Sequence, residues 1–239
     1  MNFITVSMDM LVNHAAKLRF MSGGQTNVPI VVRTMTGTGF GTGGQHCDFY
    51  EAWFAHTAGM KVVIPSNPSD AYGLLRSAIE DNDPVLFIEN IPLYFITQET
   101  TFEKVPLGKA RVAREGTDLT IVSYANIANH ALAAAEELAG EGRSVEVVDL
   151  RTIFPWDRET VLASAKKTGR VLITHEAVTE FGVGAEVAAV INEELFGQLK
   201  APVRRLGSAF CAVPFSKPLE TAFAPTPATI KAAAIELFA

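Results

Sequence analysis

Hydrophobic positions in this chain occur in two alternating patterns: short continuous runs, and residues spaced three or four positions apart. Short, mostly apolar runs rich in β-branched residues occur at Val28–Thr34, Lys61–Ile64 and Val85–Glu89, and such runs are typical of strands buried in a parallel sheet. Between them, apolar residues recur every three or four positions, as in Val6–Met21 and from Ser69 to Glu80, which predicts helices. Strands that alternate with helices predict an α/β fold with mainly parallel sheets flanked by helices.

The segment Ile96–Pro106 interrupts this alternation, because it is polar, rich in threonine and without periodicity. Such a segment is typical of a linker. We therefore predict a first α/β domain over residues 1–95, a linker over 96–106 and a second α/β domain over 107–239. The elements expected in the second domain are strands at Leu119–Ser123, Val145–Asp149, Arg170–Thr174 and Val203–Leu206, and helices at Ile127–Leu138, Asp157–Lys167, Gly184–Phe196 and Ala228–Phe238.

Composition narrows the class of protein. Hydrophobic residues make up 48% of the 239 positions and charged residues 19%, which favours a folded core over disorder. The net charge of −6 argues against nucleic acid or an anionic membrane as partner. Two cysteines, far apart, favour a reducing compartment over a disulfide framework. No apolar run reaches roughly 18 residues, so no membrane span is expected.

A glycine-rich loop, TGTGFGTGG, precedes His46. Its letters match a dinucleotide-binding fingerprint, but the next strand does not end in the acidic residue that such a site requires. An imidazole at the exit of a loop that permits close backbone approach is a candidate for proton transfer; the alternative is a structural histidine bonded to a nearby carbonyl. Asp48 either faces His46, where it would raise the basicity of the ring, or is solvated.

Several sequence blocks resemble one family. GGQH, EAWFAH, GMKVVIPSNPSDAYGLL and SAIEDNDPVLFIEN occur in close order, and LRTIFPWD, ITHEAVTEFGVGAEVAAVI and KAPVRRLG follow in the second half. They resemble the beta subunits of the thiamine-diphosphate-dependent decarboxylating component of 2-oxo acid dehydrogenase complexes, which are similar to transketolase. The resemblance implies a partial pyrimidine-binding-type domain over residues 1–95 and a transketolase C-terminal-like domain over 107–239.

The resemblance also implies an activity. The family, with pyruvate dehydrogenase as its best-known member, carries out oxidative decarboxylation of a 2-oxo acid and reductive acylation of lipoamide. We expect pyruvate as substrate, with branched-chain 2-oxo acids and acetoin as alternatives. The expected partners are an alpha subunit, in an alpha2-beta2 heterotetramer, and a lipoyl acyltransferase core. Thiamine diphosphate would be shared with the alpha subunit, which would hold the magnesium ion, in the cytoplasm or in an organelle matrix or stroma.

By the same resemblance, individual residues acquire roles. His46 matches the histidine that faces the thiazolium ring and assists acyl transfer, and Phe3 matches an aromatic residue beside the aminopyrimidine; a frayed terminal residue is the alternative for Phe3. Some family members bind potassium through carbonyl and side-chain oxygens, and the alternative here is an ordinary capped turn. The matching positions are Ile30, Ala78, Ile79, Asp81 and Asp83.

The resemblance begins at Asn2-Phe3, and the family's glutamate that bonds the pyrimidine nitrogen is expected upstream of that block. The chain alone is therefore expected to be inactive. Three explanations stay open: a fragment or misassigned start, a separate polypeptide that supplies the missing part, or a non-catalytic relative. The alternative function is an interaction module that docks on the alpha subunit or the acyltransferase core.

Overall fold

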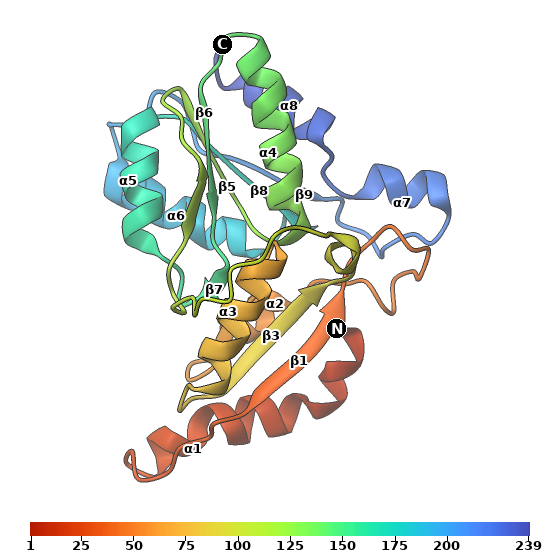
Figure 1. Ribbon diagram of the computed structural model, residues 1–239, viewed down its shortest axis with the longest axis vertical. Coiled ribbons are helices and arrows are strands. Elements are labelled where there is room, and N and C mark those ends of the chain that lie inside the picture. Colours follow the sequence, from red (N-terminus) through yellow and green to blue (C-terminus); the bar gives the residue numbers. More distant parts are fainter. The chain divides into compact units, whose positions relative to one another are not determined.

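The computed structural model describes residues 1–239, which divide into two compact units. Unit 1 contains Met1–Lys109, Arg151–Trp156 and Ala212–Glu220, and unit 2 contains Ala110–Leu150, Asp157–Cys211 and Thr221–Ala239. Two short segments from the second half of the sequence therefore pack with the first half. We describe each unit by itself, with the element labels of Figure 1.

Unit 1 is built on a four-stranded sheet with the order β1-β3-β2-β7. Strands β1 (Val31–Thr36), β2 (Lys61–Val63) and β3 (Val85–Asn90) are parallel, with Val85 opposite both Val31 and Lys61. Strand β7 (Thr152–Phe154) pairs antiparallel with β2. The sequence pattern predicted neither β7 nor the edge strand Arg111–Arg114 of unit 2, since both are short and pair antiparallel with strands distant in sequence.

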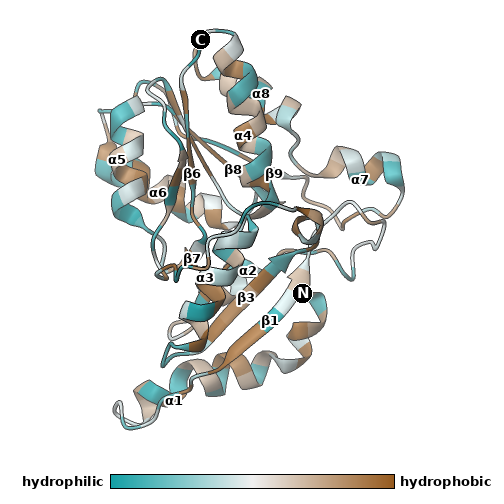
Figure 2. Cartoon of the chain, viewed as in Figure 1, coloured by the Kyte–Doolittle hydropathy of each residue, from teal (hydrophilic) through white to brown (hydrophobic).

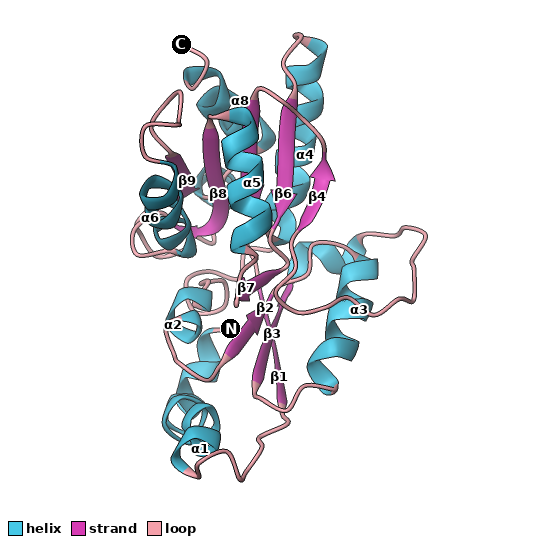
Figure 3. Ribbon diagram, turned by 90° about the vertical axis from the view of Figure 1, so that its left-hand side faces the viewer, coloured by secondary structure: helices cyan, strands magenta, loops and turns pink.

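Helical segments lie on both faces of this sheet (Figure 3). Helix α3 (Pro68–Ile79) lies on one face, and α2 (Glu51–Ala55) and the N-terminal helical run lie on the other. That run consists of η1 (Asn2–Ser7), η2 (Met10–Ala15) and α1 (Ala16–Met21), and a further short segment, η3 (Ile91–Phe95), follows β3. Helix α3 begins where the Asn67 side chain accepts the backbone N–H of Asp70 at 2.9 Å, an N-cap that the following proline reinforces.

Unit 2 is built on a five-stranded sheet with the order β4-β6-β5-β8-β9. Helices α4 and α8 cover one face and α5 and α6 the other (Figure 3), and the inner strands between them are largely hydrophobic (Figure 2). The strands are β4 (Arg111–Arg114), β5 (Leu119–Ser123), β6 (Val145–Asp149), β8 (Val171–Val178) and β9 (Arg204–Ser208). The helices are α4 (Ala125–Gly140), α5 (Arg158–Thr168), α6 (Val183–Leu195), α7 (Lys217–Phe223, shared between the units) and α8 (Pro227–Glu236).

The predicted fold class is confirmed: both units are α/β, and their sheets are mainly parallel. The exceptions are the edge strands β4 and β7, which are antiparallel to their neighbours. In unit 2 the alanine-rich face of α4 packs with α8 over buried residues such as Leu119, Ile121 and Val147. None of the helices combines the length and apolar character that crossing a membrane would require.

Candidate functional site

The structure brings together His46 and Phe3, two residues that the sequence singled out. His46 lies in the connection between β1 and α2, where its backbone N–H donates to the Gly43 carbonyl at 3.2 Å. Its side chain is exposed. Phe3, in η1, is 66% exposed, and its ring meets the imidazole edge-to-face at a centroid distance of 5.3 Å. An aromatic ring and an imidazole thus share one accessible surface of unit 1.

Asp48 stabilises this surface without touching the imidazole. Its Oδ2 accepts hydrogen bonds from Asn2 Nδ2 at 2.6 Å and from the Tyr50 hydroxyl at 3.0 Å. Asn2 Nδ2 also donates to the Gly44 carbonyl at 3.1 Å. Burial, followed by the bond to Asp48, raises the pKa of Tyr50. The Asp48 carboxylate therefore neither faces His46 nor is simply solvated. It links η1 to the glycine loop through hydrogen bonds, which hold Phe3 beside His46.

The glycine-rich loop is held by a carboxylate that sequence reasoning missed. Gly39 and Gly41 have φ values of +108° and +65°, a region that glycine adopts without strain. Their N–H groups point to Glu220, which Gly39 reaches at 2.7 Å and Gly41 at 3.1 Å from each oxygen. Backbone amides turned to one side form an anion-binding concavity. Here the carboxylate of Glu220 occupies that concavity, so these amides already have an acceptor.

The five residues predicted for potassium lie around one end of α3. Asp81 and Asp83 form the turn after the helix, and Lys61 Nζ lies 2.7 Å from both Asp81 oxygens and 3.2 Å from Asp83. Burial alone would lower the pKa of Lys61, but its bonds to the two carboxylates outweigh burial and raise it. The carbonyls of Ile30 and Ala78 accept the N–H groups of Val85 and Asp81 at 3.0 and 3.3 Å. The remaining residue, Ile79, has a side chain that is 62% exposed.

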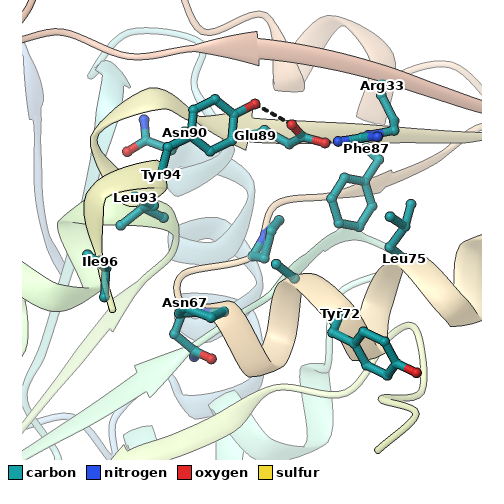
Figure 4. Close-up of a pocket in the computed structure, with 13 residues that line it drawn as sticks. Arg33, Asn67, Tyr72, Leu75, Phe87, Glu89, Asn90, Leu93, Tyr94 and Ile96 are labelled. Atoms are coloured by element: carbon teal, nitrogen blue, oxygen red, sulfur yellow. Dashed lines mark hydrogen bonds and ion pairs between the residues drawn. The ribbon is translucent and has the colours of Figure 1, made fainter. Parts of the chain in front are cut away.

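A pocket of about 410 Å³ lies elsewhere in unit 1, between α3, β3 and η3 (Figure 4). Its walls are mostly apolar, with Tyr72 and Phe87 among them, and one side carries a polar chain: Arg33 Nε donates to Glu89 at 2.5 Å, and the Tyr94 hydroxyl donates to the same carboxylate. Burial, followed by the bond to Glu89, raises the pKa of Tyr94 to about 12. Neither His46 nor Phe3 lines this pocket.

Comparison with known proteins shows the family to which the chain belongs. Residues 1–95 match the transketolase pyrimidine-binding domain and residues 108–230 the transketolase C-terminal domain. Over 218 residues the chain is 44% identical to the pyruvate dehydrogenase E1 component subunit beta of Bacillus subtilis, a match that covers 90% of the chain and 67% of that protein. The chain belongs to the E1 beta-subunit family.

Other relatives show the breadth of the E1 beta-subunit family. A mitochondrial pyruvate dehydrogenase E1 subunit beta of Arabidopsis thaliana is 45% identical over 92% of the chain, which spans 62% of that protein's length. The beta subunit of an acetoin:2,6-dichlorophenolindophenol oxidoreductase of Bacillus subtilis is 40% identical over 99% of the chain and 70% of its own length. The predicted resemblance is confirmed, while the two groups of relatives carry different substrates in their names.

A solved structure shows the same fold. A split-gene transketolase, described as an inactive beta4 tetramer, superposes with a TM-score of 0.82 over 99% of this chain and 73% of its own, at 23% identity. At that identity the likeness concerns architecture only. It agrees with the two transketolase domains that the E1 beta-subunit family shares.

Proposed function

We propose that this chain acts as the beta subunit of a thiamine-diphosphate-dependent 2-oxo acid dehydrogenase, in which a partner alpha subunit completes the active site. The observation that supports this most directly is the surface formed by His46 and Phe3. The exposed imidazole and the exposed aromatic ring, with centroids 5.3 Å apart, together offer a partner or ligand a group for proton transfer and a flat apolar face. The type of reaction, decarboxylation of a 2-oxo acid on thiamine diphosphate, is proposed from membership of the E1 beta-subunit family.

The residues of this surface fit the pyrimidine end of the cofactor. Phe3 offers an aromatic ring against which a planar heterocycle can pack. The diphosphate end has no obvious place here, because the amides of the glycine loop already bind Glu220. The chain brings together no group of three or more acidic, histidine or cysteine side chains suited to a metal ion. We propose that the alpha subunit holds magnesium and the diphosphate, as membership of the E1 beta-subunit family implies. When bound, thiamine diphosphate supplies stabilisation of negative charge at its reactive carbon.

His46 is proposed to transfer a proton during acyl transfer to the lipoyl group. An imidazole can hold or release a proton at either ring nitrogen near neutral pH. The exposed ring leaves its nitrogens accessible to a substrate, and its contact with Phe3 restricts its orientation. The chain therefore contributes a group for proton transfer and a flat apolar neighbour, both on one surface.

Reconstitution tests this proposal. The chain would be co-expressed with the alpha subunit and acyltransferase from the same source, supplied with thiamine diphosphate and magnesium, and assayed for decarboxylation and for acylation of the lipoyl domain. We expect a heterotetramer that turns over a 2-oxo acid. The competing function is a non-catalytic interaction module. Stable binding to the alpha subunit or the acyltransferase core with no turnover of any substrate would favour that function instead.

The substrate is proposed to be pyruvate, since relatives at 44–45% identity carry pyruvate dehydrogenase in their names. Acetoin oxidoreductase subunits at 40–41% make acetoin the first competitor, with branched-chain 2-oxo acids next. Rates with these three classes, compared as kcat/KM in the same assembly, decide between them. A reducing compartment, either cytoplasm or an organelle matrix or stroma, is proposed because the two cysteines are far apart in sequence and form no disulfide.

Potassium remains a proposal for the turn after α3. The turn needs a cation beside Asp81 and Asp83, and Lys61 already provides one. Potassium could bind there only if the ammonium group moved aside. A potassium titration of the melting temperature, with sodium as the control salt, tests this. A rise in the melting temperature specific to potassium supports the site, whereas equal curves for both salts leave Lys61 and Arg19 as the cations beside the two carboxylates.

A further inference from the structure

The carboxylate of Glu220 lies in unit 1 although it is 181 residues from Gly39 in sequence. The side chain is 3% exposed, and a buried carboxylate is costly unless hydrogen bonds satisfy its oxygens. Both oxygens accept the N–H of Gly41, and one also accepts that of Gly39. The amides of Gly39 and Gly41 thus satisfy the two oxygens of the buried carboxylate, which act as acceptors.

The rest of the segment Ala212–Glu220 packs along the same loop. A Cβ atom added to Gly43 would lie 3.3 Å from the Cβ of Phe215, and one added to Gly44 would lie 3.2 Å from that of Ala212. Gly43 in turn accepts the backbone N–H of His46 at 3.2 Å. The contacts therefore run without a break from Glu220, through the glycine loop, to the residue that carries the imidazole.

We propose that Glu220 is the positioning residue for His46. The glycine loop has few side chains with which to pack, and glycine loses more conformational freedom on ordering than any other residue. Charge-assisted hydrogen bonds from two of its amides hold the loop in one conformation and thereby fix the point from which His46 projects. The catalytic part of this inference rests on the proposed function; the loop-ordering part does not.

The first test measures the order of the glycine loop in the full chain by amide hydrogen exchange. Selective ¹⁵N-glycine labelling gives separate amide signals, and hydrogen exchange at Gly39 and Gly41 reports the two bonds to Glu220. We expect E220A to speed exchange at both amides by about tenfold to a hundredfold, with unchanged exchange in β5 and β6. E220Q should have a smaller effect in the same direction, because it keeps an acceptor oxygen but loses the charge.

The control is E103Q, which neutralises an exposed glutamate of the same unit and should leave both amides unchanged. Wild-type exchange rates at Gly39 and Gly41 in E220Q, and in E220A if it folds, would overturn the proposal. A ¹³C-histidine spectrum adds a second readout. The His46 signal, identified by its loss in H46A, should move in the Glu220 variants while the His175 signal stays in place.

The second test addresses catalysis in the assembled enzyme. E220Q should lower kcat for lipoyl acylation by about tenfold while KM for the 2-oxo acid stays unchanged, because a displaced proton-transfer group affects the reaction step more than binding. In an H46A background, E220Q should cause no further loss, since its effect passes through His46. Additive losses would overturn the positioning role. An inactive wild-type assembly would refute the proposed function, and the exchange experiment would still decide whether Glu220 orders the loop.

Discussion

His46 in unit 1 and His175 in unit 2 lie in opposite environments. His46 is exposed, contacts one exposed aromatic ring, and follows a loop that a carboxylate holds from outside. His175, in β8, is fully buried, stacks on Tyr124, and donates from Nδ1 to the Ala177 carbonyl at 3.0 Å. The same side chain is available for chemistry in one unit and serves packing in the other, and the difference comes from what surrounds each ring.

The environment of His175 disfavours a second proton on the ring and leaves no space for a ligand at Nε2. Since a carbonyl only accepts, Nδ1 carries hydrogen, and Nε2 is a buried acceptor without a partner. A Cβ atom at Gly182 would lie 3.3 Å from Nε2, and one at Gly184 only 2.7 Å from it. Burial, reinforced by the nearby positive charge of Arg205, lowers the pKa of His175 to about 4. The ring is therefore neutral at physiological pH and has no room to exchange protons with a substrate.

The largest expected effect is the loss of the buried ring. H175A should lower the free energy of unfolding by about 3–5 kcal/mol, as for other large buried rings, because it removes the stack on Tyr124 and leaves a cavity. Urea unfolding followed by circular dichroism measures this. A loss below about 1 kcal/mol would mean that His175 does not support the core of unit 2.

The second-largest expected effect is a loss of stability in acid, caused by the buried His175. Because the folded pKa of His175 lies below its unfolded value near 6.5, stability is complete above that pH and falls as the pH drops from about 6.5 towards 4. The total loss is about 3 kcal/mol. Urea midpoints at pH 7, 5.5 and 4.5 measure it, with H175A as reference, since that variant lacks this contribution. Parallel pH curves for wild type and H175A would refute the assignment.

Two glycine-to-alanine substitutions, G184A and G140A, should change stability by smaller amounts and in opposite directions. G184A places a methyl group against His175 Nε2 and should cost about 1–3 kcal/mol by overpacking. G140A, at the end of α4, meets no atom within 4 Å and should stabilise by about 0.5–1 kcal/mol. Melting temperatures of the two variants against wild type test the pair. Equal shifts in both would show that contact with His175 is not the cause.

The smallest expected effect on stability is at His46. H46A removes an exposed ring and should change the free energy of unfolding by no more than about 0.5 kcal/mol. A cost as large as that of H175A would show that His46 is a structural residue and would count against its catalytic assignment.

Sequence patterns predicted much of this molecule, because its main strands are long enough to show buried runs and its helices show their period. The strand at Leu119–Ser123 and the helix opened by Asp157 fall where expected, the latter capped by Asp157 accepting the Thr160 N–H at 3.2 Å. Periodicity carries no information about partners distant in sequence. That is why β7, the Lys61–Asp81 pair and Glu220 were not foreseen, and why Asp48 turned out to bind Asn2 and Tyr50.

The central claim, that His46 transfers the proton in acyl transfer, is tested most directly by one comparison. The reconstituted wild type, H46A and the exposed-histidine control H56A would be followed in a single turnover from 2-oxo acid to acylated lipoyl domain. Loss of a general acid–base group predicts that H46A is slower by a factor of about 10²–10⁴, while H56A matches wild type. Acylation by H46A at the wild-type rate, in an assembly that decarboxylates normally, would contradict the account.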